Sequence, residues 1–252
     1  MRTFILMSIF ILFTAPLYGA DVALKAYIQG DLTRAIELAK QSQDMEEQFL
    51  ECKITMVQSG LYGAYKDYKS EIDRITSICE SFHEKYPQHF NGRLSVAMSY
   101  ALKSKIYSSA SLAKKSKKMF EEIVDKYPNN PEALGALATW HSEIDRAGFF
   151  VRMALGGSKK KADKLFAKAV TLGDFSLPLQ IKYLNYLAYG KKREAAEVLA
   201  KKIAAKAPVE PYEIFMQSQA SKIITAMRTG KKKKLMKAMA AATAFAKTEK
   251  DG

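Results

Sequence analysis

The sequence predicts an all-α protein: a right-handed α-solenoid of five to six antiparallel helical hairpins that occupies residues 21–252 as a single domain. Three observations support this prediction. The chain has only 13 Gly and 7 Pro in 252 residues, and it is dominated by Ala, Lys and Leu, which favour helices. Small and bulky residues recur along it at offsets of four and then three. Most of these recurrences end at a proline, which stops a helix.

Residues 1–20 are predicted to form a secretory signal peptide. Arg2 supplies a positive charge, residues 4–13 (FILMSIFILF) are apolar, and Gly19 and Ala20 are small residues suited to cleavage. The alternative is an uncleaved anchor. However, residues 4–20 contain Pro16 and number only 17, near the lower limit of about 17–25 residues for a membrane span. We therefore expect a periplasmic or secreted protein, released by cleavage.

Four sets of residues carry the repeat. In each set the offsets of four and three place the members on one face of a helix. The sets are Ile75, Cys79 and Phe82 before Pro87; Ser116, Phe120 and Ile123 before Pro128; Ala162, Phe166 and Ala169 with Asp174 in the place of proline; and Ala196, Ala200 and Ile203 before Pro208. A small residue beside a bulky one lets two helices approach and interlock, as stacked hairpins require.

Further hairpins are predicted on either side of the repeated region. They pair residues 22–28 with 32–40, residues 45–59 with 65–86, and residues 211–228 with 231–247. Asp31 is the expected N-cap of its helix. The last helix has one apolar face, formed by Leu235, Met239, Ala242 and Ala246.

The segment Leu137-Ala138-x-x-His141, followed by Ala162-x-x-x-Phe166 and Asp174, resembles the tetratricopeptide-repeat (TPR) family, whose pattern is Leu-Gly-x-x-Tyr, Ala-x-x-x-Phe and Pro. The resemblance covers residues 71–208 and is specific for fold, not for function. It implies that the first helix of each hairpin lines a concave groove. The spacings here are 41, 46 and 34 residues, whereas the family period is about 34. The excess lies inside hairpins, as at residues 147–161, and predicts longer helices or protruding loops.

The chain is also similar to irregular TPR proteins of the bacterial envelope, such as the periplasmic TPR subunit associated with TRAP transporters. That subunit is often lipid-anchored through a cysteine, and no cysteine follows directly after the apolar segment here.

The most unusual polar cluster is the segment at 140–146 (WHSEIDR), on the predicted first helix of the third hairpin. Trp140, His141 and Arg146, with Tyr100 from the previous repeat, are the predicted partner-binding residues. The alternative is that Trp140 belongs to the core while Glu143 or Asp145 pairs with an arginine of a neighbouring turn. A catalytic role for His141 would need a partner that the sequence does not supply, so no catalytic residue is predicted.

Cys52 and Cys79 are the two cysteines of the chain, and they fall on the two arms of one predicted hairpin. In an oxidising compartment they could form a disulfide if their Cα atoms lie within about 7 Å. The alternative is a pair of buried thiols that pack as small apolar residues. His83 and His89 are expected at the surface, since their spacing does not suit a metal pair, and no metal or cofactor is predicted.

The formal charge of +14 is unevenly distributed: residues 21–90 carry a net −4 and residues 91–252 a net +17. Three basic runs fall at or near predicted hairpin turns: Lys159, Lys160 and Lys161; Lys191, Lys192 and Arg193; and Lys231, Lys232, Lys233 and Lys234. They are expected to line one edge of the stack and to face an acidic protein or peptide, or an anionic membrane surface. The alternative is that they are solvated turns. Nucleic acid is not a predicted partner, because 32 of the 40 basic residues are Lys and aromatic stacking partners are lacking nearby.

The expected function is therefore non-catalytic: an exported scaffold or adaptor that binds a protein or peptide in its concave groove. The alternative is a periplasmic transporter-associated subunit that binds or passes a small solute. That function would need an enclosed pocket or pore instead of an open groove.

Overall fold

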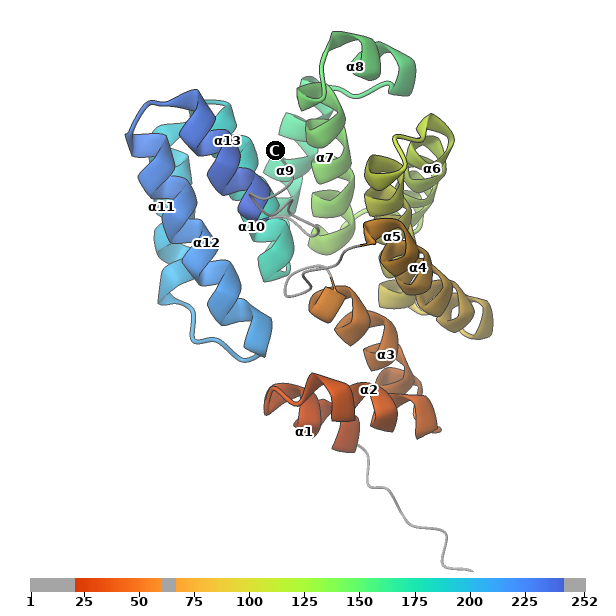
Figure 1. Ribbon diagram of the computed structural model, residues 1–252. Coiled ribbons are helices and arrows are strands. Elements are labelled where there is room, and N and C mark those ends of the chain that lie inside the picture. The colour runs from red at the N-terminus through yellow and green to blue at the C-terminus, as the bar shows by residue number, and fades with distance from the viewer. Residues whose placement is uncertain (1–20, 60–66, 243–252) are drawn as a thin grey trace, which may run out of the picture.

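The computed structural model describes residues 21–59 and 67–242 (Figure 1). Over these residues the chain forms thirteen helices and no strands, which confirms the all-α prediction. The helices are α1 Val22–Ile28, α2 Leu32–Gln41, α3 Met45–Val57, α4 Tyr68–Lys85, α5 Phe90–Ile106, α6 Ala110–Lys126, α7 Pro131–Arg146, α8 Phe149–Leu155, α9 Lys159–Leu172, α10 Leu177–Tyr189, α11 Arg193–Ala205, α12 Pro211–Arg228 and α13 Lys232–Ala241.

Side-chain caps fix where many of these helices begin. Asp31 accepts a hydrogen bond from the backbone N–H of Arg34, as its predicted N-cap role requires. Other capping side chains are Asp44 before α3, Asp67 before α4, Ser109 before α6, Asn130 before α7 and Ser158 before α9. Each cap satisfies a backbone donor that the helix itself cannot pair, which stabilises the helix by about 1 kcal/mol.

Helices that follow one another in sequence pack as neighbours. The pairs α1–α2, α5–α6, α7–α9, α10–α11 and α12–α13 are in contact, and α3 contacts both α2 and α4. The predicted expansion at residues 147–161 is α8, a separate short helix that projects from the rest of the protein between α7 and α9 (Figure 1).

The repeating small and bulky residues form the contacts between helices. All twelve helix-face residues of the four predicted sets are buried. Phe120 and Ile123 lie in one core cluster with residues of α5, α7, α9 and α10, and Phe82 lies in another with residues of α3, α4 and α5. The predicted burial of these helix faces is therefore confirmed over the described residues.

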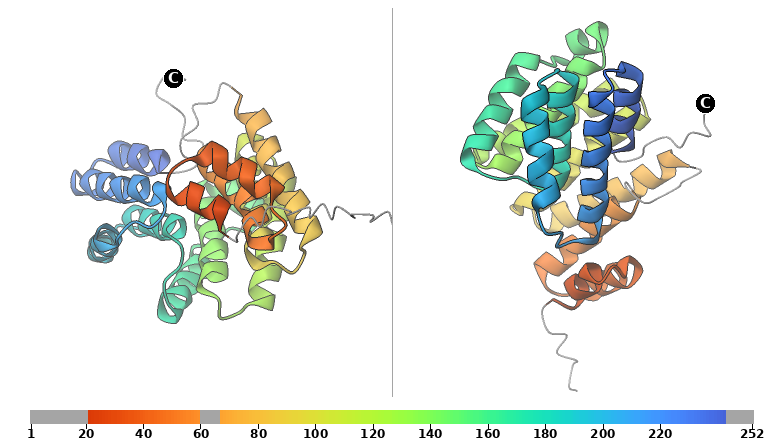
Figure 2. Two further views of the ribbon diagram at one scale, coloured as in Figure 1. Left: turned by 90° about the horizontal axis from the view of Figure 1, so that it is seen from below. Right: turned by 90° about the vertical axis from the view of Figure 1, so that its left-hand side faces the viewer.

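The two ends of the described chain share one core. A single apolar cluster joins residues of α1–α3 to residues of α10–α13. The buried Tyr27 hydroxyl donates to Glu210 Oε2 at 2.8 Å, and Lys53 Nζ lies 2.7 Å from Glu210 Oε1. Figure 2 shows α1 beside the start of α12, so the helix pairs curve until the first meets the last.

Candidate functional site

A small pocket of about 120 Å³ lies between α7 and α10 and is bordered by the start of α9. Its lining residues are Ser142, Glu143, Asp145, Arg146, Lys159, Lys182, Tyr186, Tyr189 and Gly190. Lys182, Tyr186 and Tyr189 lie at offsets of four and three, so α10 presents them on one face. The pocket therefore combines charged and aromatic side chains from three helices.

Glu143 is the negative centre of this pocket. Its carboxylate lies 2.6 Å from Arg146 Nη2 and 3.7 Å from Lys182 Nζ. Burial alone would raise the pKa of Glu143, but the charges of Lys182, Arg146 and Lys105 lower it, so Glu143 is ionised. Burial lowers the pKa of Lys182, and the charge of Glu143 opposes that change.

One carboxylate therefore faces two cations, with Lys105 as a further positive charge close enough to affect both. Asp145 does not compensate the surplus, because it pairs with Arg152 of α8 at 3.3 Å. This arrangement leaves uncompensated positive charge and hydrogen-bond donors at a partly enclosed site, which suits a carboxylate or another anionic group.

The rim of the pocket brings two of the basic runs together. Lys159 and Lys192 both pair with Asp163 at 2.8 Å, and both ammonium groups lie within 6 Å of the Tyr186 ring centroid. Burial opposes ionisation of Asp163, but the hydrogen bonds from Lys159 and Lys192 outweigh it and hold its pKa well below the usual range. Through these two ion pairs, Asp163 links the start of α9 to the turn before α11.

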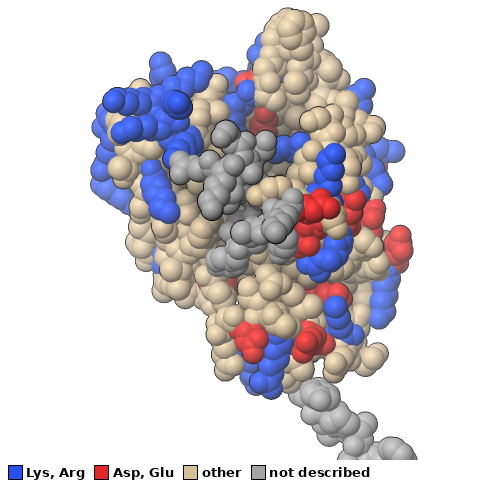
Figure 3. Space-filling model, viewed as in Figure 1, with Lys and Arg blue, Asp and Glu red and all other residues tan. Residues whose placement is uncertain are grey.

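The third basic run reaches the next turn of α10. Lys232 Nζ lies 5.9 Å from the centroid of the Tyr189 ring, and the Arg146 guanidinium lies 5.8 Å from the same centroid. The three runs thus surround the C-terminal end of α10. Figure 3 shows Lys and Arg side chains gathered over the ends of α11 and α13, at the upper left of that view.

The predicted partner-binding residues occupy different places. Arg146 lines the pocket, but Tyr100, Trp140 and His141 are 5%, 5% and 1% exposed, so they do not line an open groove. Trp140 Nε1 donates to Ser116 Oγ at 3.1 Å, and Tyr100 contacts Glu80 and Lys115. These contacts match the alternative considered from the sequence: Trp140 belongs to the core, and Glu143 pairs with Arg146 one turn away.

The burial of these residues has a physical reason. Tyr100 and His141 occupy equivalent positions in the repeated segments at 96–100 and 137–141, and a residue that recurs with the repeat packs between helices. Burial and the charges of Lys161 and Lys117 lower the pKa of His141 to about 4, so it is neutral near pH 7. The missed pocket residues Lys182, Tyr186 and Tyr189 had a sequence signal, a polar stripe at helical spacing.

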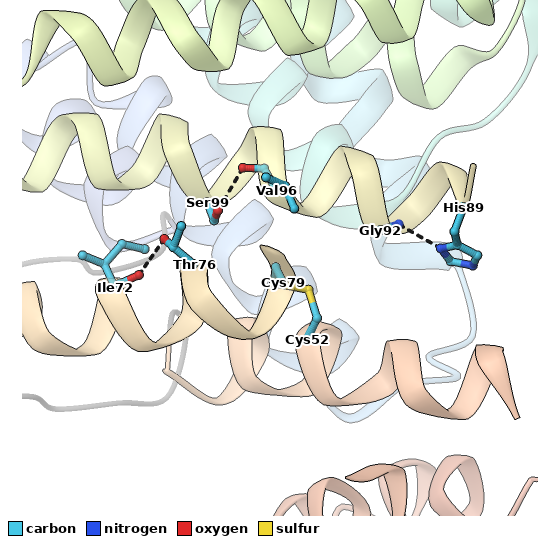
Figure 4. Close-up of a disulfide and its surroundings, with 8 residues drawn as sticks. All are labelled: Cys52, Ile72, Thr76, Cys79, His89, Gly92, Val96 and Ser99. Carbon is cyan, nitrogen blue, oxygen red and sulfur yellow. Dashed lines mark hydrogen bonds between the residues drawn. A yellow bond between two sulfur atoms is a disulfide. The ribbon is translucent and has the colours of Figure 1, made fainter. Parts of the chain in front are cut away.

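Cys52 of α3 and Cys79 of α4 form a disulfide in the structure, with their Cα atoms 4.9 Å apart (Figure 4). Both residues are fully buried. The bond links the two helices across the segment at 60–66, which lies outside the described residues together with the predicted signal at 1–20.

His89 does not lie at the surface, contrary to the expectation for that residue. The His89 side chain is only 7% exposed, and its Nδ1 accepts the backbone N–H of Gly92 (Figure 4). Its ring packs on Phe49 and Phe82. His83 is half-buried on α4, and burial lowers its pKa. After Pro87 the chain turns directly into α5, so His89 serves as the N-cap of that helix.

No group of three or more His, Cys, Asp or Glu side chains in the described ranges could hold a metal ion. Nor is any helix of residues 21–59 or 67–242 long and apolar enough to cross a membrane. Comparison with known proteins found no family model and no curated protein that matches the chain.

Proposed function

We propose that this chain is an exported, non-catalytic binding protein with TPR-like architecture, in which the helix pairs form a right-handed α-solenoid. The proposed partner is an acidic protein or peptide, one of whose carboxylates is held in the pocket between α7 and α10. The proposal rests on one observation: the carboxylate of Glu143 contacts both Arg146 and Lys182. A ligand carboxylate would take the donors and the positive charge that a single glutamate leaves uncompensated.

The size of the pocket suits the binding of one acidic group and is too small for a larger part of a folded partner. About 120 Å³ accommodates a carboxylate side chain, while the rest of a peptide would extend over the lysines at the rim. Tyr186 and Tyr189 supply flat walls against which an extended chain could lie. Charged rim residues speed association with an oppositely charged partner and make it sensitive to salt.

The test is calorimetric titration with hexaglutamate, with hexalysine as the charge-reversed probe. Arg146→Gln and Lys182→Gln should each weaken hexaglutamate binding by about tenfold, because each removes a charged donor. Arg93→Gln and Lys103→Gln are matched controls. Arg93 lies 2.6 Å from Glu122, Lys103 lies 2.7 Å from Asp73, and both are 24% exposed, as Lys182 is. Equal losses in the pocket variants and in the controls would refute the assignment.

The cavity volume also favours a second candidate, a transporter-associated subunit that binds a small acidic solute. Succinate separates the two functions, since it offers carboxylates without a peptide chain. Binding of succinate at least as tight as that of hexaglutamate, lost in Arg146→Gln, would favour the solute. Tighter binding of hexaglutamate would favour the peptide.

A further inference from the structure

Helix α8 presents an exposed apolar surface at one end of the molecule. Phe149, Phe150 and Met153 are 58%, 84% and 68% exposed, and no residue of α8 is buried. In Figure 3 this helix forms the tan protrusion at the top. Such exposure of large apolar side chains on one short helix marks an interaction surface, because water is an unfavourable environment for them.

The position of α8 is fixed by its ends. Gly148 and Gly156 flank it with φ of 112° and 73°, which only glycine adopts without strain. Arg152 ties it to Asp145 of α7. A Cβ atom on Gly157 would lie 2.5 Å from Ile144 Cγ2, so the chain after α8 packs directly on α7. The apolar side chains are therefore held outward by the fold.

Cations lie at the same end of the molecule as this protrusion. The basic run at 159–161 follows α8 closely in the chain, and contacts with Asp163, Tyr186 and Tyr189 place the runs at 191–193 and 231–234 around the C-terminal end of α10. All ten of these residues are exposed. Lys160, Lys161, Lys191 and the run at 231–234 have no acidic partner among the described residues. We call α8 with these three runs the tip face.

We propose that the tip face docks on an anionic lipid bilayer, with α8 inserted at the level of the headgroups. Exposed Phe and Met side chains among Lys and Arg are the combination that interfacial segments use: the apolar groups enter the boundary region while the cations contact lipid phosphates. The long lysine side chains can reach the headgroups from turns that lie further back.

The shape of the surface favours a bilayer over an acidic protein. The apolar side chains stand on a projecting helix and not in a groove, so a protein partner would need a matching pocket. A fluid bilayer accommodates a convex wedge without one. No helix of the described chain is a membrane span, so the expected mode is peripheral binding. The tip face shares Lys159 with the pocket, but this inference does not depend on anion binding in the pocket, since Arg146 and Lys182 have no part in it.

The direct test places a reporter on α8. In the full chain, Phe150→Trp adds an exposed indole to buried Trp140, and the difference between the variant and wild-type emission isolates it. With vesicles of phosphatidylglycerol and phosphatidylcholine we expect a blue shift and quenching by brominated acyl chains. With phosphatidylcholine alone, or at about 1 M salt, where the Debye length is about 3 Å, both signals should decrease strongly.

Sets of substitutions in the tip face, each compared with an equal number of similar substitutions elsewhere, identify the side chains responsible for vesicle binding. Phe149→Ser, Phe150→Ser and Met153→Ser together should reduce vesicle partitioning by at least about tenfold. The control changes Val198, Val209 and Ile214 to Ser, which are 68%, 64% and 63% exposed outside the tip face, and should bind like wild type. Changing the four lysines at 231–234 to Gln should also weaken binding, whereas Lys25→Gln, Lys164→Gln, Lys201→Gln and Lys222→Gln together should have less effect.

Three results would overturn the proposal. One is vesicle binding without quenching at position 150, which would assign the binding to another segment, such as the apolar residues 4–13. The second is a blue shift that depends on protein concentration and needs no lipid, which would make α8 a self-association surface. The third is a blue shift with hexaglutamate but not with vesicles, which would make the tip face a protein-binding surface.

Discussion

Reduction of the Cys52–Cys79 disulfide should lower the free energy of unfolding by a calculable amount. The bond joins residues 27 positions apart and closes that loop in the unfolded chain. The loss of chain entropy for a loop of this length corresponds to about 3.5 kcal/mol at 25 °C. For a domain of this size, that loss would lower the melting temperature by about 10 °C.

The assay is thermal and urea unfolding followed by circular dichroism, with and without reductant. Cys52→Ala with Cys79→Ala is the internal control: it should unfold near the reduced wild type and should not respond to reductant. Both side chains are fully buried, so a small loss from altered packing is also expected in the double variant. Two free thiols by mass in the purified protein, or equal stability with and without reductant, would refute the reasoning.

The remaining predictions concern packing, pH and charge. Gly92→Ala should destabilise the fold by about 1–3 kcal/mol, because its Cβ would lie 2.6 Å from Phe82. Gly135→Ala meets nothing closer than 3.5 Å and should be neutral or stabilising by up to about 1 kcal/mol, with urea denaturation as the measurement for both. His141 has a pKa of about 4 when folded against an ordinary 6.5, so the unfolded chain binds the extra proton between these values. Stability should therefore fall as the pH falls from about 6.5 to about 4, by up to about 3 kcal/mol, and His141→Asn should flatten this part of the urea-denaturation profile. Asp163→Asn should cost about 0.2–1 kcal/mol in the same assay, since the side chains of Asp163, Lys159 and Lys192 are 35%, 56% and 45% exposed. No measurable cost, or a cost well above this range, would contradict its role as a surface link between turns.

Helix positions were predictable because local signals specify them. Pro211 starts α12, and the residues predicted for that helix, 211–228, are those observed. The small and bulky sets were predictable for a second reason: repetition of an apolar pattern at helical spacing has few explanations other than packing. The same logic, applied consistently, would also have placed Tyr100 and His141 in the core.

The pocket was less predictable, because it depends on contacts between helices far apart in sequence. Glu143 and Lys182 are 39 residues apart, and no local pattern pairs them. Arg146 was predicted to be a binding residue from its local cluster, but Trp140 and His141 of that cluster are buried. The protrusion at α8 was partly predictable: the extra length at 147–161 indicated a protruding segment, while the exposure of its phenylalanines required the tertiary structure.

The most direct test of the anion pocket is the effect of Glu143→Gln on hexaglutamate binding. Glu143 occupies the two cations that the ligand is proposed to use, so its neutralisation should free them and tighten binding by about tenfold. This is the opposite sign to the effect of Arg146→Gln, and general damage to the fold cannot produce it. Binding that is weakened or unchanged in Glu143→Gln would contradict the proposed function.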